Sequence, residues 1–298
     1  MNGNRFQALK KWRVIDLIQW TTQFFEKKKI PDARLNAERL LGRVLGLNRV
    51  QLYLRFEDIL MQSELDDFRK HVKRRLNNEP LQYILGETEF MSLPFKLTPS
   101  VLIPRPDTEI LVEQVLEQTP QNVKISILDI GTGSGNIAIS LAYYLPQSRI
   151  VAVDISQEAI EVARENAILN HVNERIGFER EDVFDNSFAM KFGNGFDRIV
   201  SNPPYISETE FKTLPEEVRS FEPSIALRDG ADGLTFHRRI SQVAVEMLAP
   251  GGKIFLEVGQ GQSKDVQNIL EQDGFQKVYV VKDLAGIDRV LVGEKKFD

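Results

Sequence analysis

The middle of the chain holds the stretch Ile127-Leu128-Asp129-Ile130-Gly131-Thr132-Gly133-Ser134-Gly135-Asn136, an apolar run that leads through alternating glycines into a helix start. Glycines let the backbone turn sharply and let a ligand approach the main chain closely. The next apolar run ends at Asp154, nineteen residues after Gly135, where a carboxylate can accept hydrogen bonds from both ribose hydroxyls of a nucleoside. Together these features predict a strand, a nucleoside-binding loop and a helix.

The glycine spacing narrows the choice of nucleoside. The pattern is Gly-x-Gly-x-Gly and not the Gly-x-Gly-x-x-Gly of pyrophosphate binders, and no Walker lysine follows, which argues against phosphoryl chemistry. Asp129 would repel a pyrophosphate but could hold a cationic amino-acid end through water or amide contacts. We therefore expect S-adenosylmethionine as the cofactor. Its predicted contacts in the loop are Gly131, Thr132, Gly133, Ser134 and Gly135.

The segment Glu181-Asp182-Val183-Phe184, after the third predicted strand, is placed to meet the adenine ring. Asp182 could accept a hydrogen bond from the adenine amino group, while Val183 and Phe184 would pack against the ring. An acid at the start of a loop can equally cap the backbone of its own turn. The sequence leaves both roles of Asp182 open.

A second candidate motif, Ser201-Asn202-Pro203-Pro204-Tyr205, follows the apolar run at 196–200. Proline cannot continue a sheet ladder and holds the preceding residue extended, so Asn202 is expected at the ligand edge of the sheet. Its side-chain carbonyl and the Pro203 main-chain carbonyl can each accept one N–H of an NH2 group, and Tyr205 can stack on a planar group. Asn-Pro-Pro can also be no more than a turn, but the glycine loop upstream favours the clamp.

Residues 123–298 alternate strand and helix patterns, which is typical of a wound parallel sheet. Strands are predicted at 125–130, 150–153, 176–179, 196–200, 253–258, 278–281 and 289–292. The main helices are predicted at 136–144, 157–170, 234–248 and 263–272.

The first 80 residues differ in pattern and in charge. Apolar stripes at 14–28, 31–47 and 50–56, and a helix that begins at a Ser63-x-x-Asp66 capping box, predict a small helical bundle. This part carries 17 Lys and Arg against 10 Asp and Glu, whereas the rest carries 21 against 33. The basic surplus predicts either solvated helix faces or a docking surface for an acidic or nucleic-acid-associated partner.

Between these two parts, strand-like pieces at 83–86 and 90–97 are broken by glycine and proline, which predicts a β-hairpin connector. The stretch Pro104-Arg105-Pro106-Asp107-Thr108-Glu109 follows. It is an ordinary helix start that could also fold over the ligand edge of the next domain.

Composition excludes several classes of function. The chain has no cysteine, which excludes disulfides, thiolate metal sites and a cysteine nucleophile, and its three histidines are far apart, so no metal site is expected. No apolar run reaches membrane-spanning length and the start lacks the apolar core of a signal peptide. We therefore expect a cytoplasmic protein without a membrane partner.

The glycine loop, Asp154 and the Asn202–Tyr205 motif together resemble the amino-methyltransferases that use S-adenosylmethionine. Glu79-Pro80-Leu81-Gln82-Tyr83-Ile84-Leu85-Gly86 and Leu102-Ile103-Pro104-Arg105-Pro106-Asp107-Thr108-Glu109 resemble signature segments of one branch, the release-factor glutamine N5-methyltransferases. The resemblance covers essentially the whole chain, including the helical amino-terminal part.

The resemblance implies methylation of the glutamine in the Gly-Gly-Gln motif of class-one peptide chain release factors. It also implies an α/β, Rossmann-like seven-stranded sheet with a reversed last strand. The domains would be a helical docking domain at 1–80, a hairpin linker at 81–104 and a methyltransferase domain at 105–298. Val183 departs from relatives that carry an aromatic residue near the adenine. The residues that carry over are the loop Gly131–Gly135, Asp154 and Asn202 as cofactor contacts, Asn202, Pro203, Pro204 and Tyr205 as the substrate clamp, and Phe90 with the 104–109 loop as pocket walls.

Two other functions fit parts of this pattern. A DNA N6-adenine methyltransferase could use the same clamp on a base amine, but it needs basic residues on the catalytic face, and here the catalytic part is acidic. A non-catalytic nucleoside-binding adaptor would have no need of the Asn202 clamp. We therefore expect no direct nucleic-acid substrate and expect an enzyme.

Overall fold

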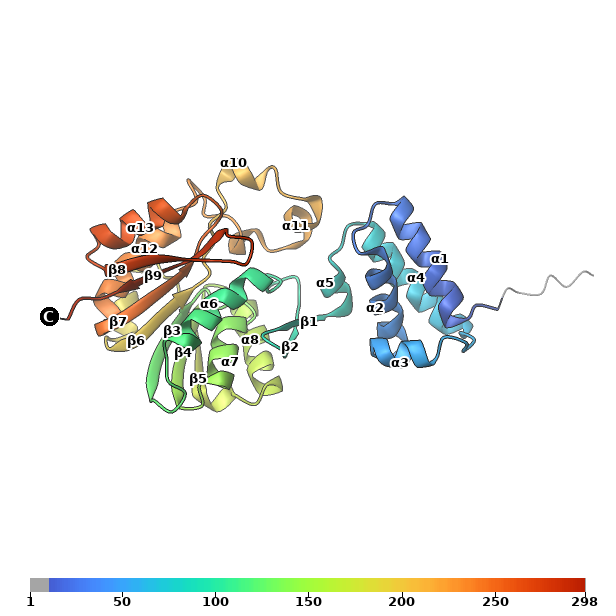
Figure 1. Cartoon of the computed structure of the whole chain (residues 1–298), viewed down its shortest axis with the longest axis horizontal. Helices are drawn as coiled ribbons and strands as arrows, with labels where there is room; N and C mark the ends of the chain where they lie inside the picture. The colour runs from blue at the N-terminus through green and yellow to red at the C-terminus, as the bar shows by residue number, and fades with distance from the viewer. Residues whose placement is uncertain (1–10, 298) are drawn as a thin grey trace, which may run out of the picture. The chain divides into compact units, whose positions relative to one another are not determined.

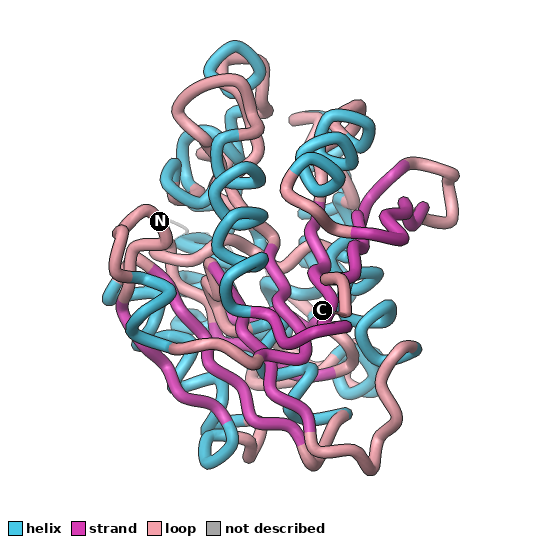
Figure 2. Tube along the Cα trace, turned by 90° about the vertical axis from the view of Figure 1, so that its left-hand side faces the viewer, coloured by secondary structure: helices cyan, strands magenta, loops and turns pink. Residues whose placement is uncertain are grey.

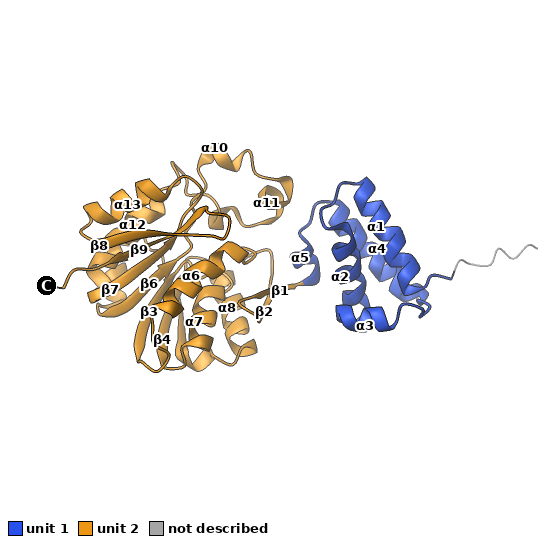
Figure 3. Ribbon diagram, in the orientation of Figure 1, with its two compact units in different colours: residues 1–85 blue, residues 86–298 orange. Residues whose placement is uncertain are grey.

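A computed structural model of the chain describes residues 11–297 (Figure 1). The chain divides into two compact units, Met1–Leu85 and Gly86–Asp298 (Figure 3). Residues 1–10, where the predicted helical domain begins, and Asp298 lie outside the described residues.

The first unit is the predicted helical bundle. Its apolar faces close around a common core that includes Ile18, Phe25, Leu41 and Phe68, all of them buried. Amphipathic helices of this length gain most of their stability from such packing. The helices are α1 (Val14–Lys27), α2 (Ala33–Leu45), α3 (Arg49–Leu54), α4 (Gln62–Leu76) and α5 (Leu81–Leu85).

Two details of this unit differ from the sequence prediction. Residues 83–86 were expected to be extended, but Leu81–Leu85 form helix α5, and Ile84 N–H donates to the Pro80 carbonyl at 3.1 Å. A short apolar run bounded by proline fits a buried helix as well as a strand, so periodicity alone does not separate them. Helix α4 also begins one residue before Ser63, and the Glu64 carboxylate, not Asp66, accepts from the amide that precedes the helix, that of Met61.

The second unit starts with the predicted β-hairpin, β1 (Glu87–Phe90) and β2 (Leu93–Lys96), which pair antiparallel. Its two-residue turn, Met91-Ser92, has positive φ at both positions, as a type I′ turn requires. The Glu109 carboxylate accepts from Met91 N–H and the Tyr144 hydroxyl donates to the Met91 carbonyl, so the turn is fixed by neighbouring helices.

The main sheet of the second unit has seven strands, as predicted. Their order is β5-β4-β3-β6-β7-β9-β8, and β9 runs antiparallel to both of its neighbours, which confirms the expected reversed last strand. Strand β3 pairs with both β4 and β6. The strand order therefore reverses at β3: β4 and β5 lie on one side of it, and the later strands lie on the other. The strands are β3 (Ile125–Ile130), β4 (Ser148–Asp154), β5 (Ile176–Arg180), β6 (Phe196–Ser201), β7 (Leu248–Glu257), β8 (Gln276–Lys282) and β9 (Asp288–Glu294).

Helices cover both faces of this sheet (Figures 1 and 2). One face packs against α6 (Pro106–Glu117), α7 (Asn136–Tyr144) and α8 (Gln157–Leu169). The other packs against α9 (Phe188–Phe192), α12 (Thr235–Met247) and α13 (Ser263–Gln272). Because both faces are covered, the central strands read as continuous apolar runs. Short elements fill the remaining connections: η1 (Asn173–Arg175), α10 (Glu208–Phe211), α11 (Glu216–Phe221) and η2 (Ser224–Ala226).

This topology places the ligand site. In open α/β sheets, ligands bind outside the carboxyl ends of the strands where the strand order reverses. Here the order reverses at β3, which lies between β4 and β6. The glycine loop follows β3, Asp154 ends β4 and Asn202 follows β6, so the three predicted motifs come to one edge. Within residues 11–297, no helix is long and apolar enough to cross a membrane.

Asn166, on α8, ties the hairpin to the glycine loop. It is fully buried, its Oδ1 accepts from Lys96 N–H at 2.7 Å, and its Nδ2 donates to the carbonyls of Lys96 and Ser134. Asn166→Ala should lower the free energy of unfolding by about 2–4 kcal/mol, because it leaves the buried Ser134 carbonyl and the partly buried Lys96 backbone groups without these partners. Urea unfolding measures this, with the exposed Asn173→Ala as control. Equal loss in the two variants would contradict the assigned role.

Candidate active site

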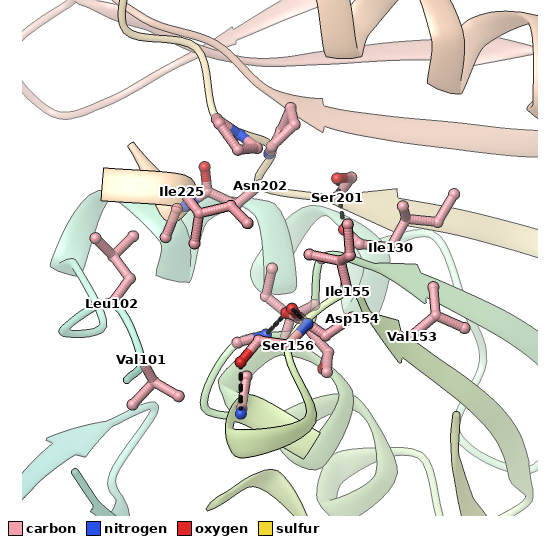
Figure 4. Close-up of a pocket in the computed structure, with 18 of the residues that line it drawn as sticks. Val101, Leu102, Ile130, Val153, Asp154, Ile155, Ser156, Ser201, Asn202 and Ile225 are labelled. Atoms are coloured by element: carbon pink, nitrogen blue, oxygen red, sulfur yellow. Dashed lines mark hydrogen bonds between the residues drawn. The ribbon is translucent and has the colours of Figure 1, made fainter. Parts of the chain in front are cut away.

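A pocket lies at the carboxyl ends of β3, β4 and β6 (Figure 4). In Figure 4, Asn202 and Ile225 lie on one side of the cavity and Asp154 and Ser156 on the other. Its lining comes from five stretches of chain: the segment 100–108, the glycine loop, the end of β4 with the residues after it, the loop 181–184, and the segment after β6 with Ile225, Ala226, Phe236 and Ile240.

Glycine is required at the three loop positions for different physical reasons. Their φ angles are +75° at Gly131, +55° at Gly133 and +82° at Gly135, in the left-handed region that favours glycine. Space is open where a Cβ would stand at Gly131 and Gly133, so a ligand can approach the backbone there. A Cβ at Gly135 would lie 2.8 Å from Ile139 Cδ1, so Gly135 permits close helix packing. Gly131, Thr132, Gly133 and Ser134 line the pocket, whereas Gly135 is not among the lining residues.

Asp129 lies behind the loop, not in the pocket. Its side chain is fully buried and its Oδ2 accepts from Thr132 Oγ1 at 2.7 Å. Burial raises the pKa of Asp129 to about 7. The expected contact with the cationic end of the cofactor is therefore corrected: this carboxyl is buried outside the pocket lining and fixes the loop through Thr132.

Asp154 lines the pocket and also holds the loop. Its Oδ2 accepts from Gly133 N–H at 2.8 Å and its Oδ1 from Ser156 N–H at 3.0 Å. Burial raises the pKa of Asp154, while these backbone hydrogen bonds lower it. Each carboxylate oxygen has a second lone pair, so both can still accept a ligand hydroxyl.

The loop after β5 shows the capping role of Asp182, while its hydrogen bond to adenine stays a prediction. The Asp182 Oδ1 accepts from Phe184 N–H at 2.9 Å, which caps the turn, and Asp182 also lines the pocket. Val183 is buried in the lining, and Phe184 is 41% exposed with its ring 5.1 Å from that of Phe236, edge to face. The pocket thus has an apolar wall suited to a flat ring.

Asn202 stands directly after β6, as predicted. Its Nδ2 donates to Thr108 Oγ1 at 3.1 Å, so Oδ1 is the acceptor that the amide presents on its other side. The preceding Ser201 anchors the strand end, because its hydroxyl donates to the Ile130 carbonyl at 2.7 Å. Asn202, Pro203 and Pro204 line the pocket, and the two prolines lie beyond the end of the sheet.

Two predicted substrate-binding residues lie elsewhere. Tyr205 is not among the lining residues: its hydroxyl donates to Glu257 Oε1 at 3.3 Å, and its ring packs close to Gly259. Phe90 is 2% exposed, packs edge to face on Phe95 in the core, and does not line the pocket. Alternating residues of a half-buried hairpin strand face the core, and Phe90 occupies such a position.

Of the predicted cover at 104–109, Pro104, Arg105 and Thr108 line the pocket, and residues 100–102 line it as well. Arg105 Nη2 lies 2.5 Å from Oε1 of Glu222, whose side chain is buried, and Ile103 N–H donates to the same carboxylate. This ion pair joins the cover to the segment that carries Ile225.

Neither Glu257 nor the part played by Thr108 was predicted from the sequence. Glu257 ends the apolar run of β7 at the same edge of the sheet as Asp154 ends β4, which is the signal that could have marked it. Thr108 had been explained as part of a helix start. Its partner is 94 residues away in sequence, so no local pattern reveals the contact.

The buried Asp129 makes stability depend on pH. Its pKa of about 7 in the folded protein is above the ordinary value, so between roughly pH 4 and 7 the folded state keeps a proton that the unfolded chain has lost. The free energy of unfolding should therefore fall as pH rises through this window, by up to about 1.4 kcal/mol per pH unit for one group. Urea unfolding across this range should show a shallower slope for Asp129→Asn and no change for the exposed Asp66→Asn. An unchanged slope in Asp129→Asn would contradict the assignment.

Comparison with known proteins places the chain in a family. Residues 16–86 match the model of the PrmC N-terminal domain, and residues 106–217 match that of the methyltransferase small domain. The release factor glutamine methyltransferase of Chlorobaculum tepidum is 44% identical over 95% of this chain and 97% of its own length. That of Geobacter sulfurreducens is 44% identical over 95% of this chain and 96% of its own.

Solved structures show the same fold at lower identity. A methyltransferase from Pyrococcus furiosus matches with a TM-score of 0.52 and 18% identity, over 76% of this chain and 99% of that one. The 16S rRNA N2 G1207 methyltransferase of T. Thermophilus, in complex with AdoMet and guanosine, matches with a TM-score of 0.51 and 20% identity, over 70% of this chain and 50% of that one. Fold and sequence agree, and the chain belongs to the release factor glutamine methyltransferases.

Proposed function

We propose that this enzyme transfers the methyl group of S-adenosylmethionine to the side-chain amide nitrogen of the glutamine in the Gly-Gly-Gln motif of class-one peptide chain release factors. Family membership makes it an S-adenosylmethionine-dependent protein-glutamine methyltransferase. The observation that carries the finer proposal is the Asn202 amide, fixed by Thr108 at the end of β6 and lining the same pocket as the glycine loop and Asp154.

The described residues fit the cofactor. Gly131 and Gly133 leave open space beside their backbone, and Asp154 keeps acceptor capacity for two ribose hydroxyls. Val183 and Phe184 offer an apolar wall to the adenine, with Asp182 beside them. Bound S-adenosylmethionine supplies a methyl group on a sulfonium, which is an electrophile.

The chain's own contribution is to prepare the nucleophile. An amide nitrogen is a poor nucleophile because its lone pair is delocalised into its carbonyl. If Asn202 Oδ1 and the Pro203 carbonyl each accept one N–H of the substrate amide, the lone pair localises on nitrogen and points into the pocket. Positioning and electrostatics that match the transition state then provide the rate. No strong base is required, because the nitrogen becomes acidic as it is methylated and loses a proton late.

The second part of the proposal concerns which part of the chain docks the substrate protein. The helical part at 1–80 has a surplus of seven positive charges and would dock the release factor, with 81–104 as linker and 105–298 as the methyltransferase domain. A cytoplasmic location follows from a substrate of the translation machinery. The acidic catalytic part remains a poor match for duplex DNA, as the sequence indicated.

Labelled S-adenosylmethionine tests this function. Purified release factor, a version with Gly-Gly-Ala in place of Gly-Gly-Gln, and duplex DNA are each incubated with the enzyme. We expect label in the first alone. Label in the Gly-Gly-Ala version or in DNA would overturn the glutamine assignment.

A further inference from the structure

Next to Asn202 lies a buried polar group of three side chains, one of which, Thr108, also lines the pocket. Thr108 is 1% exposed and Glu257 2%, and Tyr205 is half-buried. The Asn202 Nδ2 donates to Thr108 Oγ1 at 3.1 Å, and the Tyr205 hydroxyl donates to Glu257 Oε1 at 3.3 Å. Thr108 and Tyr205 both interact with the Glu257 carboxylate and favour its ionised form.

The direction of these hydrogen bonds decides which end of the Asn202 amide faces the pocket. A hydroxyl has one proton, whereas an ionised carboxylate can only accept. Glu257 Oε2 accepts no hydrogen bond from residues 11–297, and the Thr108 hydroxyl interacts with the Glu257 carboxylate, so the Thr108 proton can turn toward it. The Thr108 oxygen must then accept, and only the NH2 end of Asn202 can donate. An amide without such a partner could present either end, since the two are nearly equal in shape.

We propose that Thr108, oriented by Glu257, is the positioning residue that holds Asn202 with its carbonyl oxygen toward the substrate nitrogen. This inference rests on the proposed function, which needs an acceptor and not a donor at that point. In this role Thr108 acts through Asn202. Glu257 acts one step further back, through Thr108.

The charged groups around Glu257 make this orientation sensitive to pH. Burial raises the pKa of Glu257 to about 7; the Asp107 carboxylate adds to this rise, and Arg289 opposes it. The His237 ring faces the backbone here, because its Nε2 donates to the Glu257 carbonyl at 2.9 Å. A protonated Glu257 can donate to Thr108, whose own proton would then turn toward Asn202 and favour the flipped amide. Activity should therefore fall as pH drops below about 7.

Three threonine variants test the positioning role. Thr108→Val keeps the shape and removes the hydroxyl, Thr108→Ser keeps the hydroxyl, and Thr119→Val alters another buried threonine whose hydroxyl has no hydrogen-bond partner among residues 11–297. We expect Thr108→Val to lower kcat by about tenfold to a hundredfold, a loss typical of misplaced reacting groups, with little change in the Kd of S-adenosylmethionine. Thr108→Ser and Thr119→Val should resemble wild type. A Thr108→Val enzyme as active as Thr119→Val, or a Thr108→Ser enzyme as slow as Thr108→Val, would overturn the proposal.

The pH profile of kcat tests Glu257. The side chain in Glu257→Gln does not ionise. The pH profile of kcat for this variant should therefore lack the loss of activity below about pH 7 that we expect of wild type. An equal loss of activity below about pH 7 in wild type and in Glu257→Gln would overturn the role of Glu257.

A readout without methyl transfer separates this inference from the proposed function. The side-chain NH2 signal of Asn202 in 15N-labelled enzyme, assigned by its loss in Asn202→Asp, should exchange slowly in wild type and Thr119→Val and rapidly in Thr108→Val. Equal exchange in all three would refute the positioning role even where the enzyme is active. A wild type that shows this exchange pattern but transfers no methyl group to release factor would refute the proposed function and leave the hydrogen bond intact.

Discussion

Asn202→Ala should lower the kcat of methyl transfer by about a hundredfold to a thousandfold, the range seen when one preorganised polar contact to a transition state is removed. The reason is that the substrate amide loses the acceptor that localises its lone pair. Cofactor binding should fall far less than turnover, because the glycine loop and Asp154 remain even though Asn202 is also an expected contact. Single-turnover transfer and a calorimetric Kd for S-adenosylmethionine separate the two effects.

Asn202→Asp is the matched comparison. It keeps an acceptor and adds charge, but it removes the NH2 that donates to Thr108. We expect activity between that of Asn202→Ala and wild type. Wild-type turnover in Asn202→Ala would show that Asn202 is a turn residue and not part of the chemistry.

The second large effect concerns the cofactor. Asp154→Ala should weaken binding of S-adenosylmethionine by about tenfold to a hundredfold, because a hydrogen bond to a charged group contributes about 1.5–3 kcal/mol. The same variant frees the N–H groups of Gly133 and Ser156, which loosens the loop. Calorimetric titration of the cofactor into the enzyme measures the change.

Asp185→Ala is the control for Asp154. Asp185 also caps a turn, accepting from Ser187 N–H at 2.8 Å, but it does not line the pocket. Its loss should leave the Kd nearly unchanged. Equal weakening in the two variants would mean that Asp154 acts through turn stability and not through the ligand.

Much of the fold was predictable because its signals are local. Helices α7 and α13 begin and end at the predicted residues, and all seven strands of the main sheet lie where apolar runs predicted them. Each of these segments is long or strongly apolar and is bounded by glycine, proline or polar residues. Helix α5 was mistaken for a strand because a run of five residues, three of them buried, carries no period that separates the two.

The candidate site was predictable only in part. Motifs that occupy one strand end, such as the glycine loop, Asp154 and Asn202, are visible in sequence because their neighbours are adjacent in the chain. Tyr205 and Phe90 illustrate the limit: both belong to recognisable motifs, yet backbone direction turns Tyr205 toward Glu257 and Phe90 toward the core. The Thr108–Asn202 contact joins the start of α6 to the end of β6, and only the folded chain reveals it.

The most direct measurement is tandem mass spectrometry of release factor after reaction with wild-type enzyme and with Asn202→Ala. Fragment masses locate the added methyl group on a single side chain. We predict one methyl group on the side-chain nitrogen of the Gly-Gly-Gln glutamine with wild type, and almost none with Asn202→Ala in the same time. A methyl group on another residue, or equal methylation by both enzymes, would contradict the assignment of Asn202 as the clamp for a glutamine amide.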